Sequence, residues 1–192
     1  MFPLFSTIRS LPASRFKKKE QSMSPSEQQV LVDHVVVETT QSFERVIEAF
    51  EGQIGRKGYE AYQHVVTSSR TSEEFTQGIE RLLGSSGFME FLALDHGAWF
   101  SRLVHPLKAK LYIIGNPLIA QHFEKYSAEA GLYVPIRVQV YENARGNTCL
   151  SYDRPSSLLQ VCAVTEEEFV QTAADLDQKV AHLVQKAASQ IG

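Results

Sequence analysis

A carboxylate and a histidine stand side by side where an apolar segment of the chain ends. Asp95 and His96 follow residues 88–94, and Trp99 and Phe100 come shortly after them. An imidazole that is oriented by a carboxylate and lies near aromatic rings can serve as a general acid or base. The same pair has a purely structural explanation, since Asp95 can cap the helical turn that follows and His96 can pack as an ordinary polar residue. Both interpretations stay open.

A second carboxylate, that of Glu142, closes a segment predicted to be a strand. Glu142 shares a face with Val138 and Val140, which should point into the core. Its carboxyl group therefore either reaches solvent beside the adjacent turn, which we favour, or lies in a pocket with a raised pKa. If His96 and Glu142 converge, they form an acid–base pair for proton transfer. Asp95, His96 and Glu142 are the candidate catalytic residues.

The segment Gly115-Asn116-Pro117 marks the passage from a strand into a helix. Asn is a favoured N-cap residue, and proline at the first helical position gives up only a donor that had no partner. The free amides of such a helix start suit a carboxylate or phosphate, although no P-loop or dinucleotide motif is present. Asn116 is thus either a ligand contact or only a cap. The candidate ligand-binding residues are Asn116, Trp99, Phe100, Tyr112 and Tyr152.

Other kinds of chemistry have little support in the sequence. The six histidines are widely spaced, and the two cysteines, Cys149 and Cys162, form neither a disulfide framework nor a short metal-binding pair. No GxSxG nucleophile elbow occurs. We therefore expect no metal and no cofactor, with haem or metal binding through His96 or His105 as a remote alternative.

Composition places the chain among ordinary globular proteins. Its 192 residues suffice for one sizeable domain, and 43% are hydrophobic and 21% charged. A formal net charge of -3 argues against nucleic acid as a partner, and no apolar run approaches the roughly twenty residues of a membrane span. We expect a cytoplasmic protein, or a mitochondrial one if residues 1–22 are a transit peptide. The sequence does not decide whether Met1 or Met23 is the true start.

The order of predicted elements indicates an α+β fold, a single domain with a mostly antiparallel or mixed sheet and helices packed on it. Residues 1–25 are expected to be a disordered tail or targeting segment, and residues 26–192 the domain. Thr71–Glu74 and Thr165–Glu168 have the spacing of capping boxes that open helices. The expected strands are 30–38, 88–94, 110–114 and 136–142 with a hairpin partner, and the expected helices are 43–50, two within 57–86, 117–126 and 166–188.

Two segments permit sharper predictions. Residues 143–146, Asn-Ala-Arg-Gly, are typical of a type I turn with a left-handed glycine, and that hairpin pairs Val140 with Leu150 and Arg137 with Asp153. The continuous apolar run 110–114 predicts a strand covered on both faces. The final helix carries one apolar stripe, which we expect to pack on the sheet rather than form a dimer contact. The stripe consists of Phe169, Ala173, Leu176, Val180, Leu183 and Ala187.

Four short motifs in order give the chain a family resemblance: LDHGAWF, IIGNP, VPIRVQVYE and SYDRPSSLL. Together they resemble the domain-of-unknown-function 302 family over roughly residues 30–159, most clearly from Leu94 onward. The resemblance implies a compact α+β domain and frequent dimers, and it implies no established activity. The helices within 57–86 and the long final helix depart from the shorter members.

We expect from these features a protein that binds a small organic ligand beside its sheet. If it is catalytic, the reaction is cofactor-independent proton transfer of the isomerase, cyclase or lyase type. The alternative is a non-catalytic homodimeric interaction module, with the final helix and the helices of 57–86 as its contact surface. Expected partners are a small organic ligand and a second copy of the chain, without nucleic acid or membrane.

Overall fold

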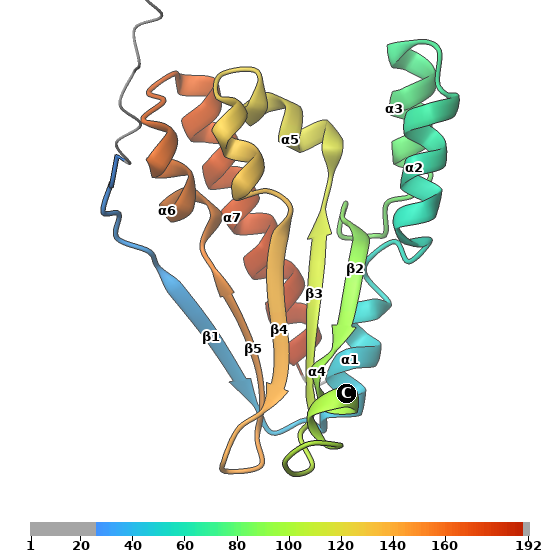
Figure 1. The fold of residues 1–192 in the computed structure, drawn as a ribbon, viewed down its shortest axis with the longest axis vertical. Helices are drawn as coiled ribbons and strands as arrows, with labels where there is room; N and C mark the ends of the chain where they lie inside the picture. The colour runs from blue at the N-terminus through green and yellow to red at the C-terminus, as the bar shows by residue number, and fades with distance from the viewer. Residues whose placement is uncertain (1–25, 190–192) are drawn as a thin grey trace, which may run out of the picture.

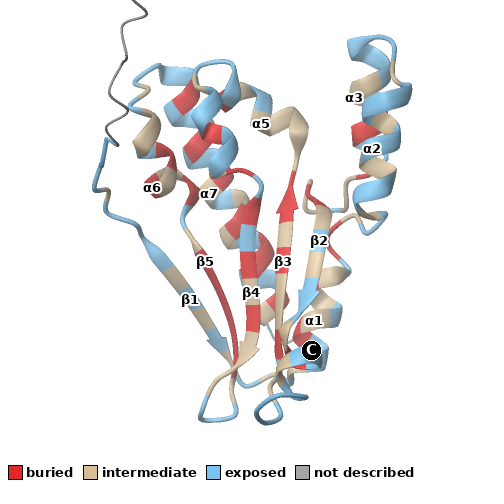
Figure 2. Ribbon diagram, viewed as in Figure 1, coloured by how far each residue is buried: buried red, intermediate tan, exposed pale blue. Residues whose placement is uncertain are grey.

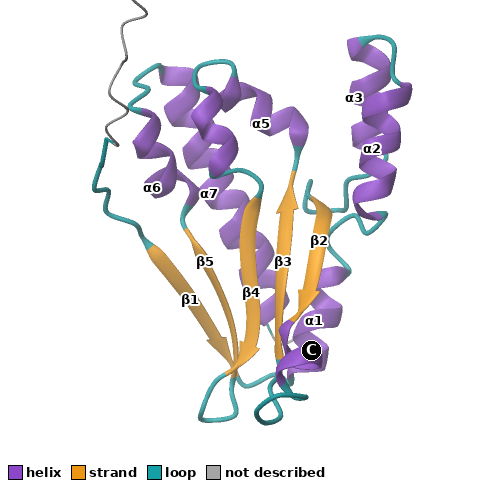
Figure 3. Cartoon of the chain, viewed as in Figure 1, coloured by secondary structure: helices purple, strands orange, loops and turns teal. Residues whose placement is uncertain are grey.

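The computed structural model describes residues 26–189, so the predictions for residues 1–25 lie outside the described part. Five strands form one antiparallel sheet in the order β1-β5-β4-β3-β2 (Figures 1 and 3). The predicted α+β class is confirmed, and every pairing in the sheet is antiparallel. The strands are β1 (His34–Thr39), β2 (Met89–Asp95), β3 (Ala109–Gly115), β4 (Ile136–Glu142) and β5 (Thr148–Asp153).

One face of the sheet carries the core. In β4 the buried Ile136, Val138 and Val140 alternate with the exposed Arg137, as expected for a strand covered on one side. The long helix α7 (Glu167–Ala188) runs behind the strands in Figure 1. The prediction that residues 110–114 are covered on both faces is therefore wrong. Leu111 of β3 stands on the open face opposite Leu94 of β2, which is 41% exposed.

The β4–β5 hairpin has the predicted register. Val140 pairs with Leu150, and the turn places its glycine, Gly146, at φ +81°. Arg137 and Asp153 approach each other at 3.9 Å between Nη2 and Oδ2 on the open face. Alternation of apolar and polar residues was sufficient to set this register, because a slip by one residue would turn the apolar side chains to solvent.

Helix α7 (Glu167–Ala188) packs its apolar stripe into the core, as predicted. All six residues of that stripe are buried, and the helix lies against α1 (Phe43–Glu51), α5 (Pro117–Glu124) and α6 (Pro155–Leu159) (Figure 2). Two short 3₁₀ helices, Ala128–Leu132 and Gln160–Cys162, complete this layer. The whole apolar stripe therefore packs inside the core of its own chain.

The predicted capping boxes behave differently. Thr71 caps α3 (Ser72–Glu80) by accepting from the Glu74 N–H at 3.1 Å, while the Glu74 carboxylate accepts from the Arg70 N–H at 2.7 Å. The second box, Thr165–Glu168, does not form. Helix α7 starts at Glu167, so Glu166 rather than Thr165 is its N-cap, and no side chain caps it. The Thr165 N–H donates to the Glu166 carboxylate at 3.1 Å, and the Glu168 carboxylate reaches across to α5.

Helices α2 (Gly58–Ser68) and α3 form a hairpin that projects beside α5 and the end of β2 (Figure 1). The hairpin packs on β2 through a second, smaller apolar core centred on Ile79, Leu82 and Met89, the last of which belongs to β2. At its base two chain segments touch backbone to backbone. A Cβ added to Gly55 would lie 1.7 Å from the Leu82 carbonyl oxygen, so only glycine fits this crossing.

Two elements differ from their expected bounds by two residues or more. The first strand begins at His34 rather than Val30, and α5 ends at Glu124 rather than near Tyr126. A short helix, α4 (His96–Phe100), follows β2. Within residues 26–189, none of the helices combines the length and the apolar character needed to cross a lipid bilayer.

Candidate functional site

A cavity of about 510 Å³ lies between the α2–α3 hairpin and α5, at the end of the sheet where β3 passes into α5. Aromatic and aliphatic side chains form most of its wall. The lining residues are Tyr59, Tyr62, Phe75, Phe88, Phe91, Gly115, Asn116, Pro117, Ile119, Ala120, Gln121, Glu124, Val134, Pro135, Ile136 and Leu176.

The aromatic wall is contributed mainly by α2 and β2. The ring of Tyr62 meets the ring of Phe91 edge to face, with 5.1 Å between centroids, and Tyr59 lies 5.8 Å from Tyr62 on the preceding helical turn. Phe88 is fully buried and Tyr59 is half exposed. The rings therefore extend from the buried interior of the cavity to its mouth.

Asn116 is the single predicted ligand-binding residue that lines this cavity. Its side-chain oxygen accepts from the Leu118 N–H at 2.9 Å, and its Nδ2 donates to the Gly87 carbonyl at 3.0 Å. Both ends of the amide are thus occupied. The geometry supports the capping interpretation, with Asn116 fixing the start of α5 against the loop before β2.

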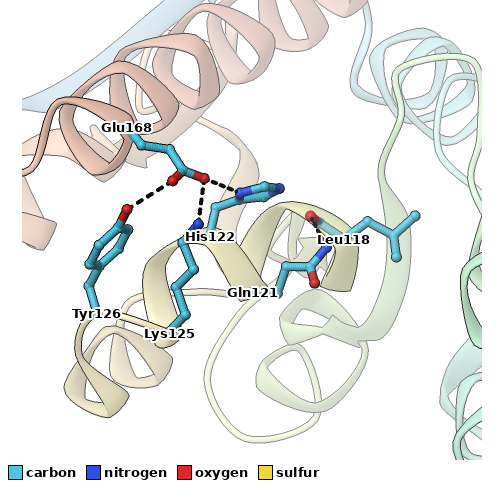
Figure 4. A network of polar contacts seen from close by, with 6 residues as sticks. All are labelled: Leu118, Gln121, His122, Lys125, Tyr126 and Glu168. Carbon is cyan, nitrogen blue, oxygen red and sulfur yellow. Dashed lines mark hydrogen bonds and ion pairs between the residues drawn. The ribbon is translucent and has the colours of Figure 1, made fainter. Parts of the chain in front are cut away.

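Two further polar side chains, Gln121 and Glu124, line the cavity from α5. Gln121 donates to the Leu118 carbonyl at 3.0 Å (Figure 4). The Glu124 carboxylate makes no hydrogen bond or ion pair within residues 26–189. Burial raises the pKa of the Tyr62 hydroxyl, and Tyr59 and Glu124 raise that pKa further, so Glu124 acts on the aromatic wall through space.

The candidate catalytic residues lie at the opposite end of the sheet. Asp95 accepts from the Ala98 N–H at 2.9 Å and so caps α4. The ring of His96 lies 6.1 Å from the ring of Trp99, which is itself half exposed. Phe100 stacks edge to face on His105. The structural interpretation of Asp95 is therefore the one that the contacts support.

Glu142 closes β4 at this same end. Its N–H donates to the Lys108 carbonyl at 3.0 Å, and its carboxylate lies 3.6 Å from the Lys108 ammonium. Among the described residues no hydrogen bond or ion pair joins His96 to Glu142. Their joint action in proton transfer stays a prediction that no contact supports.

Tyr112 and Tyr152 belong to the core and do not line the cavity. The Tyr112 side chain is fully buried, and its hydroxyl donates to Glu51 Oε1 at 2.7 Å. Lys110 binds the same oxygen at 2.6 Å, and Arg56 contacts Glu51 Oε2 at 2.7 Å. Burial alone would raise the pKa of Glu51, but the hydrogen bonds from Lys110 and Tyr112 outweigh it and lower that pKa.

This Glu51 cluster has a structural role. Arg56 extends it to Glu90, with 3.5 Å between Nε and Oε2. The negative charges of Glu51 and Glu90 are balanced by the positive charges of Arg56 and Lys110. The cluster links α1 to β2 and β3. Elsewhere too, no three His, Cys, Asp or Glu side chains within residues 26–189 lie close enough together to hold a metal ion.

Sequence reasoning missed the main walls of the cavity. Tyr59 and Tyr62 stand three residues apart, a spacing that places both on one face of a helix. That spacing is compatible with a core contact as well as with a ligand. Glu124 carried no distinguishing signal, because acidic residues on exposed helix faces are common.

Comparison with known proteins supplies a family and a fold. A family model described as "Domain of unknown function DUF302" matches residues 64–187. The match ends at the last turn of α7 and includes most of the α2–α3 hairpin, so it extends past residue 159, where the resemblance was expected to end. No curated protein matches the chain.

A solved structure shares the fold. It is described as the crystal structure of an uncharacterized conserved protein DUF302 from Bacillus stearothermophilus. The TM-score is 0.55 at 14% sequence identity, and the alignment covers 80% of this chain and 97% of that one. Because the family model matches well over half of the residues of this chain, the chain belongs to the DUF302 family.

Proposed function

We propose that this protein binds a small organic ligand in the cavity between the α2–α3 hairpin and α5. The observation that carries the proposal is the cavity itself, about 510 Å³ with a largely apolar, aromatic lining. Binding sites for small molecules are typically concave, of roughly 300–1,000 Å³, and largely apolar with a few polar groups. The cavity has each of these properties.

The walls of the cavity come from elements that are held in place by packing and by backbone contacts. The hairpin packs against β2 and α5 through a small apolar cluster and is anchored by the glycine crossing at Gly55. Helix α5 is fixed by the Asn116 cap and by its packing on α7. A ligand would therefore enter a site that is already formed, which limits the entropic cost of binding.

The proposal concerns binding and assigns no reaction. The candidate catalytic residues Asp95, His96 and Glu142 stand at the far end of the sheet and do not line the cavity. Cofactor-independent proton transfer by these residues stays a prediction, as does the homodimer. The predicted dimer surface on the final helix loses its apolar stripe, because that stripe lies inside the core of its own chain.

A neutral fluorescent probe tests the proposal. N-phenyl-1-naphthylamine should show saturable fluorescence enhancement with the full chain. Tyr62→Ser removes an aromatic wall, so it should weaken that binding at least about tenfold. Val66→Ser, at a half-exposed apolar position on the same helix that does not line the cavity, is the matched control and should leave binding unchanged.

A second variant separates binding from folding. Ala120→Phe places a ring into the cavity from α5 and should abolish probe binding without loss of the native circular dichroism spectrum. The proposal is overturned if the folded wild type gives no saturable signal, or if Ala120→Phe binds the probe as well as the wild type.

A further inference from the structure

We infer that the aromatic cavity selects an organic cation, such as a protonated or quaternary amine attached to an apolar group. This inference rests on the proposed ligand-binding function. It names the chemical class of the ligand from the charge and the ring faces of the lining.

The charge of the lining points in one direction. Among the sixteen described residues that line the cavity there is one carboxylate, that of Glu124, and no Lys, Arg or His. An anionic ligand would find no cation there. A cationic ligand would find a carboxylate that makes no hydrogen bond or ion pair in the described part of the chain.

The Lys125 ammonium, at the end of α5, is held away from the cavity. His122 and Lys125 both contact Glu168 Oε1 on α7, at 2.7 and 2.6 Å, and Tyr126 donates to the other Glu168 oxygen (Figure 4). Glu124 and Gln121 lie on the side of the helix that lines the cavity. Of the charged side chains at this end of α5, Lys125 therefore contacts α7 and Glu124 lines the cavity.

The aromatic rings of the lining supply the second part of the inference. Tyr59, Tyr62, Phe75 and Phe91 all line the cavity, and aromatic faces attract cations through their quadrupoles. Cages of several aromatic rings are the usual sites for quaternary ammonium groups. One cation, that of Lys179, approaches the ring of Phe88 at 5.9 Å, but Lys179 does not line the cavity.

Three probes of similar shape and different charge test the inference. Phenyltrimethylammonium is cationic, tert-butylbenzene is its neutral isostere, and benzenesulfonate is anionic. Calorimetric titration of the full chain should show phenyltrimethylammonium binding at least about tenfold more tightly than tert-butylbenzene, with no measurable binding of benzenesulfonate.

Variants assign this preference to the named groups. Tyr62→Leu keeps an apolar wall but removes an aromatic ring. It should therefore reduce the preference for phenyltrimethylammonium over tert-butylbenzene while binding of tert-butylbenzene is retained. Glu124→Gln should weaken the binding of phenyltrimethylammonium about three- to fivefold, a modest effect because the carboxylate is exposed. Glu129→Gln makes the same charge change outside the cavity lining and should have no effect.

The outcomes separate the two proposals. Equal affinity for the cation and its neutral isostere, or tighter binding of benzenesulfonate, overturns the inference and leaves the proposed function standing. Absence of binding by all three probes and by N-phenyl-1-naphthylamine overturns both. A cation preference that Tyr62→Leu leaves intact would show that the binding lies elsewhere, and would also overturn the inference.

Discussion

Removing the hydroxyl group of Tyr112 should destabilise the protein by a defined amount. Tyr112→Phe keeps the buried ring and its contact with Phe50, whose centroid is 4.8 Å away, and deletes only the donor to Glu51. Glu51 Oε1 keeps its 2.6 Å contact with Lys110, so no buried carboxylate oxygen loses all its partners. The cost is therefore that of one hydrogen bond to a charged acceptor.

Such a hydrogen bond contributes about 1.5–3 kcal/mol, and the remaining Lys110 contact places this one at the lower end, about 1.5 kcal/mol. For a chain of this size that corresponds to a decrease in Tm of roughly 3–6 °C. The pKa of Glu51 is lowered in the folded protein, so its contribution to stability is present above the ordinary carboxyl pKa and is lost as the pH falls. The difference between Tyr112→Phe and wild type should accordingly shrink in acid.

Urea unfolding at pH 7 measures the free-energy difference, and a double-mutant cycle with Glu51→Ala, which removes the acceptor, isolates the pair. The coupling energy should account for most of the loss in Tyr112→Phe. The reasoning is refuted if Tyr112→Phe unfolds within about 0.3 kcal/mol of wild type, a difference within the usual error of additivity, or if the loss is unchanged in the Glu51→Ala background.

Three further changes test other parts of the structure. Glu168→Gln should lower the free energy of unfolding at pH 7. Because the pKa of Glu168 is lowered from 4.5 to about 2 in the folded protein, the stability difference from wild type should shrink as the pH falls from 4.5 toward 2. A stability difference that does not depend on pH would contradict this. Gly55→Ala places a Cβ against the Leu82 carbonyl, so it should lower the free energy of unfolding in urea by at least about 2 kcal/mol. Binding of the fluorescent probe should also weaken, because the hairpin shifts. A variant as stable as the wild type would refute the close crossing. Arg137→Ala breaks an exposed pair with Asp153 and should cost under about 1 kcal/mol by the same measurement, so a larger loss would show that the pair is stronger than its 3.9 Å separation suggests.

The sheet could be predicted in detail where local rules act alone. The β4–β5 register follows from strict alternation and from the turn chemistry of residues 143–146, both of which are visible over a dozen residues. The start of α5 follows from Asn116 and Pro117 in the same way. The stripe of α7 also needed only helical periodicity. In each case the determinants lie within a few turns of the chain.

Prediction failed where a side chain had two possible partners. Glu168 has the spacing for a capping box with Thr165, but His122, Lys125 and Tyr126 together offer a carboxylate three donors from another element. Several charge-assisted hydrogen bonds outweigh one local cap. Those donors come from a segment more than forty residues away, so no local pattern could reveal the competition.

The candidate site shows the same limit on a larger scale. A cavity exists only where two packed units leave space between them, and here its walls come from α2 and α5, which are brought together by the backbone crossing of Gly55 and the α3–β2 segment. Asn116 was predicted correctly to start the helix that follows β3, but its side-chain amide caps that helix and donates to the Gly87 carbonyl. The proposed binding site instead combines aromatic rings on α2 with a carboxylate on α5. Each of these residues, taken alone in the sequence, is an ordinary surface or core residue, and only the placement of the hairpin brings them to the wall of one cavity.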